Sequence, residues 1–117
     1  MSEGTINLEI DSADRDALVL CLALGTLEAM RSGVWPLEAG IWTLGRPRFW
    51  EPLKRGGVPE EVLDVLQAAD ELDALEGLSG RAAAEALLDR MLGVIRSHLE
   101  ALPEKSWRAR WPDHGVA

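Results

Sequence analysis

The carboxylate best placed for chemistry is Glu28, which stands near the end of the most apolar stretch of the chain. A carboxylate among apolar side chains is costly to bury unless it has a partner. A salt bridge to Arg31 or to an arginine of a neighbouring loop is one explanation. The alternative is an isolated acid that acts as a general acid or base in a small-molecule pocket walled by tryptophans. The candidate walls are Trp35, Trp42 and Trp50.

The other reactive side chains are few and far apart. Cys21 is the single cysteine and lies in the uncharged run from Ala17 to Leu27, so we expect a buried thiol. His98 falls on the apolar side of an amphipathic segment and His114 lies close to the C-terminus. Zinc-site spacings, a glycine-rich phosphate loop and a GxSxG motif are all missing from the sequence. The sequence therefore predicts a protein that is not an enzyme, with no catalytic residue, metal site or cofactor.

Acidic residues fill the chain between Gly56 and Gly80, and no basic residue interrupts them. Such a helix face is either a solvated surface that aids solubility or a docking surface that attracts a basic protein. The candidate partner-binding residues on it are Glu60, Glu61, Asp64, Asp70, Glu71 and Asp73.

Two segments mix basic with large aromatic side chains, residues 46–55 and residues 105–111. Because Arg and Trp are enriched at interface hot spots, Arg48 and Trp50 join the candidate partner-binding residues. The same mixture could bind single-stranded nucleic acid by stacking. The net charge of −8 and the missing OB and RRM patterns argue against that, and the charge also disfavours an anionic membrane surface. A third explanation is internal, with the tryptophans closing one end of the domain and the arginines bridging to the acidic helix.

Composition favours helices, because Leu and Ala dominate the apolar residues and Tyr is absent. The length of 117 residues suits one domain. The N-terminus lacks the basic start and apolar run of a secretory signal, and the uncharged run is shorter than the roughly 20 residues of a membrane span. We therefore expect a cytoplasmic protein that makes no membrane contact.

Caps and breakers predict where the first elements begin and end. We expect a helix from about Ala13 to Ser32. Its middle is apolar on nearly every side, which predicts that it is the central helix. A short helix should follow from about Pro36 to Leu44. Residues 45–57 hold two prolines and two adjacent glycines and are predicted to be an irregular connection with one turn around 48–54.

The second half of the chain predicts a helical hairpin. Its first helix should begin at Pro59 and end at Gly77, and its second should be capped by Ser79 and run to Pro103. The predicted fold is thus all-α, a compact bundle of three long helices plus one or two short ones.

Both ends of the chain are predicted to lie outside the bundle. Residues 5–10 alternate apolar and polar side chains, which is typical of an extended N-terminal arm. Residues 1–103 are expected to form a single helical domain. Residues 104–117 lack any period and are expected to be a flexible tail, although Trp107 and Trp111 could fold back onto the domain.

The residues from Leu24 to Gly33, followed by Leu37, Glu38 and Ala39, resemble the helix-glycine-helix opening of small uncharacterised bacterial protein families. Immunity proteins, which neutralise toxins by binding them, are among these families. The resemblance covers about 16 residues and implies a helical binding protein. It carries no catalytic position.

These observations predict a non-enzymatic protein–protein interaction module, immunity-like, that binds a basic partner protein through the acidic helix. One alternative is a structural homo-oligomer, most simply a two-fold dimer, that buries the Trp-rich surfaces or the N-terminal arm. The other is the small-molecule pocket around Glu28 and the tryptophans.

Overall fold

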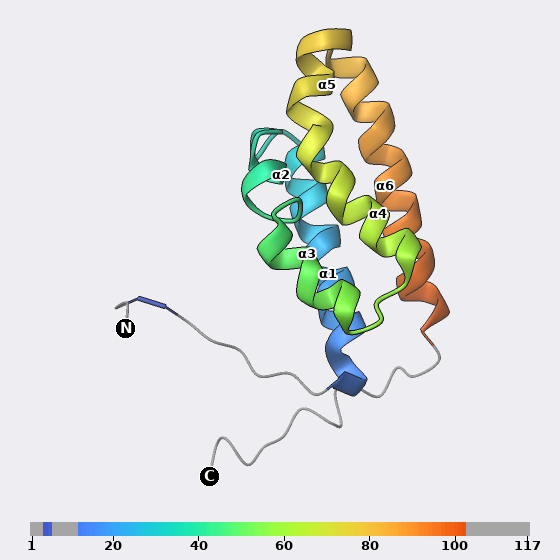
Figure 1. Cartoon of the computed structure of the whole chain (residues 1–117). Helices are drawn as coiled ribbons and strands as arrows, with labels where there is room; N and C mark the ends of the chain where they lie inside the picture. Colours follow the sequence, from blue (N-terminus) through green and yellow to red (C-terminus); the bar gives the residue numbers. More distant parts are fainter. Residues whose placement is uncertain (1–3, 6–11, 103–117) are drawn as a thin grey trace.

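The computed structural model describes residues 4–5 and 12–102, and within them all regular structure is helical (Figure 1). The prediction of an all-α fold is confirmed. The predicted N-terminal arm lies almost entirely outside the described residues, and the predicted tail lies wholly outside them. In chain order the elements are α1 (Ser12–Arg31), α2 (Ala39–Trp42), α3 (Pro47–Arg55), α4 (Glu60–Ala68), the 3₁₀ helix η1 (Ala69–Glu71), α5 (Leu72–Ser79) and α6 (Arg81–Ala101).

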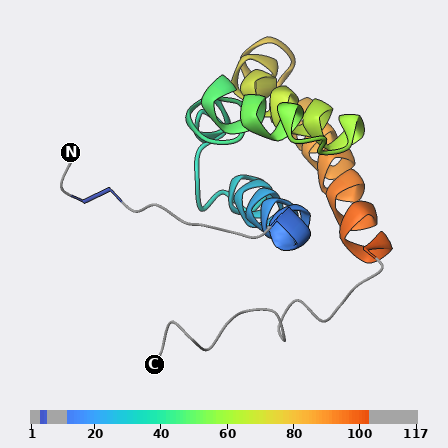
Figure 2. The same cartoon turned by 60° about the horizontal axis from the view of Figure 1, so that its bottom comes forward.

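Helix α1 buries one face and exposes another. Leu20, Ala23 and Leu27 are buried, whereas Leu22 is 47% exposed and Gly25 is exposed. Figure 2, which looks nearly along α1, shows this helix at one edge of the assembly. The prediction of a central helix is therefore wrong. An uncharged run gives no hydrophobic period, so it cannot tell which faces the neighbouring helices will leave open.

The segment after α1 turns sharply and places two glycines against η1. A Cβ atom on Gly40 would lie 2.2 Å from the carbonyl oxygen of Ala69, and one on Gly45 would lie 2.8 Å from the amide nitrogen of Asp70. Only a residue without a side chain permits this approach. Helix α2 is shorter than predicted, because Pro36 has no regular structure and residues 37–38 form a turn rather than the first helical turn.

Residues 47–55 form a helix where an irregular connection with one turn was predicted. Pro47 occupies the first helical turn, where its missing N–H costs nothing. Pro52 lies inside the helix, but the aromatic side chains of Phe49 and Trp50 pack against the core and hold the segment in place. Tertiary packing has thus overridden the local breaker signal.

The predicted third helix is divided into α4, η1 and α5. Val62, Leu63, Val65 and Leu66 bury the inner face of α4. This helical segment also ends later than predicted, because α5 continues past Gly77 to Ser79. Gly80, at φ 91°, makes the turn into α6, so the predicted Ser79 cap is wrong. A left-handed φ of this kind favours glycine.

Helices α5 and α6 form the predicted antiparallel hairpin, and α6 continues down the assembly to pack along α1 (Figure 1). The seam between α1 and α6 is apolar inside and ionic outside. Nε of Arg31 donates to Asp89 at 2.8 Å, and an Nη of Arg81 donates to the carbonyl of Met30 at 3.1 Å. No helix in the described part of the chain is long and apolar enough to cross a membrane. The largest fully buried side chains are Leu27, Met30, Leu66, Leu72, Leu88, Ile95 and Val62.

Candidate functional site

The predicted acidic residues all reach the surface, along α4, η1 and the start of α5. We call this set the acidic face; its members are Glu60, Glu61, Asp64, Asp70, Glu71 and Asp73. Glu61 faces His98, with 3.1 Å between Oε1 and Nε2. The other five make no salt bridge with any residue that the structure describes. The acidic face therefore holds carboxylates whose charge is not neutralised within the described domain.

The two other predicted partner-binding residues have different environments. Trp50 is half-buried, packs against the core and donates from its indole nitrogen to the carbonyl of Gly45 at 3.1 Å. Its position is that of an internal anchor for α3 rather than of an exposed hot spot. Arg48 is exposed and lines a groove that includes no residue of the acidic face.

That groove lies between α1, α2 and α3, is open to solvent and measures about 510 Å³. We call it the α1–α3 groove. Trp42, which is 63% exposed, carries the guanidinium of Arg46 at 4.7 Å from its ring centre. The groove thus combines apolar walls with positive charge. Its lining residues are Leu22, Thr26, Trp42, Thr43, Leu44, Arg46, Arg48 and Phe49.

A second open groove, of about 220 Å³, runs between α4 and α6. We call it the α4–α6 groove. Two members of the acidic face, Glu61 and Asp64, belong to its α4 wall, and Arg90 belongs to its α6 wall. The remaining lining residues are apolar: Val65, Ala68, Leu87, Met91 and Val94.

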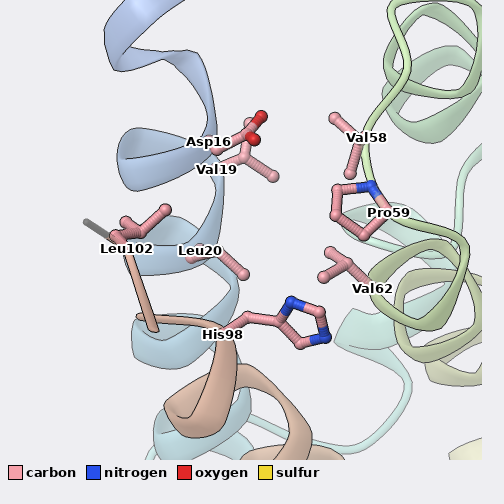
Figure 3. Close-up of a pocket in the computed structure, with 8 residues that line it drawn as sticks. All are labelled: Asp16, Val19, Leu20, Val58, Pro59, Val62, His98 and Leu102. Carbon is pink, nitrogen blue, oxygen red and sulfur yellow. The ribbon is translucent and has the colours of Figure 1, made fainter. Parts of the chain in front are cut away.

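A small cavity lies where α1, the start of α4 and the end of α6 meet (Figure 3). The imidazole of His98 points toward Val62, and the carboxylate of Asp16 lies across the cavity (Figure 3). Arg15 holds that carboxylate, with Nε 3.0 Å from Oδ1. A volume of about 40 Å³ has room for water molecules but not for a metabolite. The contact that His98 makes with Glu61 links α6 to α4 beside this cavity.

Glu28 is paired, but with a residue that the sequence did not indicate. Its carboxylate forms a salt bridge with Arg96 of α6. Arg31, the predicted partner, instead pairs with Asp89 and Glu85. Glu28 lines neither groove nor the cavity described above. Glu28 is therefore not, among the described residues, the isolated carboxylate that a general acid or base would require.

The outer face of α1 is a surface feature that the sequence reasoning missed. Cys21 is exposed rather than buried, and it lies beside exposed Leu22 and Gly25. No charged residue occurs between Asp16 and Glu28. Cys21 and Gly25 lie one helical turn apart within the Leu-rich run, and this spacing of two small residues on one side of the helix was the available signal.

The described residues contain no group of three or more His, Cys, Asp or Glu side chains arranged to hold a metal ion. Comparison with known proteins finds no match for this chain among protein-family models, curated proteins or solved structures.

Proposed function

We propose that the protein is a non-catalytic binding module whose acidic face captures a basic protein. The observation that carries the proposal is the set of exposed carboxylates without salt bridges on α4, η1 and α5. By contrast, the acidic side chains Glu76 and Glu85 are paired with Arg81, and Asp89 is paired with Arg31. Unpaired carboxylates on these three consecutive elements are available to an external cation.

Charge of one sign on one face speeds the encounter with a protein of opposite charge and selects against like-charged partners. It adds less to the lifetime of the complex, which depends on buried contacts. The proposal includes a cytoplasmic location and an immunity-like role, in which the captured partner is a toxin that binding neutralises.

The test is a charge reversal confined to the part of the acidic face that lies outside the α4–α6 groove. Glu60→Lys, Glu71→Lys and Asp73→Lys together should abolish capture of a basic protein identified by affinity purification and mass spectrometry from the source cell. The affinity of the purified pair should also fall as the salt concentration rises, because salt screens the attraction between opposite charges. Helical circular dichroism should not change, since all three side chains are exposed.

The matched control makes the same change in net charge away from the acidic face, at Glu38, Glu51 and Glu100, all exposed. It should retain capture. Equal binding by the two triple variants would refute docking on the acidic face. In the immunity-like form of the proposal, expression of the captured protein alone should arrest growth and co-expression of this chain should restore it.

A homodimer is the second candidate, and the outer face of α1 favours it. Leu22 is 47% exposed on a helix face that has no charge between Asp16 and Glu28. Gly25 on the same face would allow a second copy of α1 to approach closely. Packing two such faces would remove apolar surface from water.

Light scattering at micromolar concentration should then give twice the chain mass, and Leu22→Glu should give a monomer. Leu78→Glu is the control, because Leu78 is 86% exposed at the far end of α5. Cys21 offers a second readout, since mild oxidation should join two copies when the α1 faces meet. A monomer that stays unlinked under oxidation rules out this interface.

A further inference from the structure

Two open grooves flank the domain, and their charges differ. The α1–α3 groove carries Arg46 and Arg48, whereas the α4 wall of the α4–α6 groove carries Glu61 and Asp64. Residues 103–117, which follow the last described residue, include three basic side chains and two tryptophans. We propose that this C-terminal segment binds back onto its own domain in the α4–α6 groove.

Charge selects this groove over the other. Lys105, Arg108 and Arg110 would be attracted by the carboxylates of the α4 wall and repelled by the two arginines of the α1–α3 groove. Asp64 forms no salt bridge with a described residue, so its charge is available to the segment. Arg90 on the opposite wall has the sign that suits Asp113, which follows the basic stretch.

The apolar part of the groove suits the two tryptophans. Its lining includes Leu87 and Val94, which are only partly buried by the described domain. An indole ring placed there would bury a large apolar area and still keep its N–H near the polar rim. Trp107 and Trp111 alternate with the basic residues, so one segment can supply both kinds of contact.

The tether is long enough. Val94 lies eight residues before Leu102, or about 12 Å along α6, and Leu87 lies about 22 Å back, at a rise of about 1.5 Å per residue. An extended chain spans about 3.3 Å per residue, which gives Trp107 a reach of about 17 Å and Trp111 a reach of about 30 Å. The attachment also gives the segment a millimolar effective concentration, so that weak contacts suffice.

This inference stands apart from the proposed function, because the segment can dock whether or not a separate partner exists. It is tested on the full chain with a nitroxide spin label at Ala109→Cys in a Cys21→Ser background. The label should cause loss of the methyl peaks of Val65, Leu87 and Val94 in NMR spectra. The methyl peaks of Leu22 and Leu44, in the other groove, should keep their intensity.

Glu61→Lys with Asp64→Lys should restore the lost peaks, whereas Glu60→Lys with Asp73→Lys should not, although both pairs change the net charge equally. The unperturbed methyl peaks report that each variant is folded. Equal loss at both grooves, or no loss at either, would overturn the proposal. A mixing experiment gives a further check, in which isotope-labelled chains without nitroxide are combined with nitroxide-bearing chains that carry no isotope. Loss of the methyl peaks in that mixture would also overturn the proposal, because the contact would then come from a second copy.

Discussion

Arginines carry most of the charge pairing in the described domain, and several of their salt bridges join two different helices. Arg31 joins the end of α1 to Asp89 and Glu85 of α6, and Arg81 joins the start of α6 to Glu76 of α5. The hydrogen bond that Arg31 donates to Asp89 is the largest cause of two pKa shifts. It lowers the pKa of Asp89 and raises the pKa of Arg31. Salt bridges this accessible to solvent contribute little to stability.

A lowered pKa predicts how the contribution of Asp89 depends on pH. Its stabilising effect should be complete above the unfolded-state pKa of about 3.9 and should disappear as pH falls through the lower, folded-state value. Asp89→Asn should therefore lower the unfolding midpoint slightly at neutral pH, and the difference from the parent should vanish in acid. Urea unfolding of Asp89→Asn and of the parent across a pH series measures this difference in midpoint. A deficit for Asp89→Asn that persists in acid contradicts the assignment.

Element boundaries in the second half depend on which glycine accepts a positive φ. Gly77 lies inside α5, where an added Cβ would meet open space, whereas Gly80 stands at φ 91° and ψ 168° between α5 and α6. That combination of angles is essentially restricted to glycine. Of these two glycines, Gly80 alone therefore makes the turn between α5 and α6, although Gly77 and Gly80 look alike in the sequence.

The two glycines should respond oppositely to alanine. Gly80→Ala should destabilise the domain by about 1–3 kcal/mol, because alanine must adopt a strained backbone. Gly77→Ala should stabilise it by about 0.5–1 kcal/mol, because alanine loses less backbone entropy in a helix. Chemical denaturation of both variants measures the difference. Two changes of the same sign would show that the turn does not depend on Gly80.

At the scale of the molecule, one apolar core joins all the helices. It includes Leu27 from α1, Leu66 from α4, Leu72 from α5 and Leu88 from α6. No second core is formed by the described residues. The single domain expected from chain length is therefore expected to unfold as one cooperative unit.

Leu66→Ala tests that expectation, because its side chain is completely buried. The variant should lose about 2–5 kcal/mol of stability through the transfer term and the cavity left behind. Tryptophan fluorescence and far-ultraviolet circular dichroism should report the same shifted midpoint. Leu78→Ala, at a side chain 86% exposed, should leave both nearly unchanged. Separate midpoints for the two signals would mean that the helices unfold in more than one unit.

The sequence alone determined the helical class, the bounds of α1 to within about a residue or two, the α5–α6 hairpin and the exposure of the acidic residues. These follow from local causes: caps, breakers and an amphipathic period. The exposed side of α1, the partner of Glu28, the anchoring of Trp50 and the helix over residues 47–55 were decided by tertiary structure. Each depends on which segment packs against which, and neither an uncharged run nor a pair of prolines carries that information.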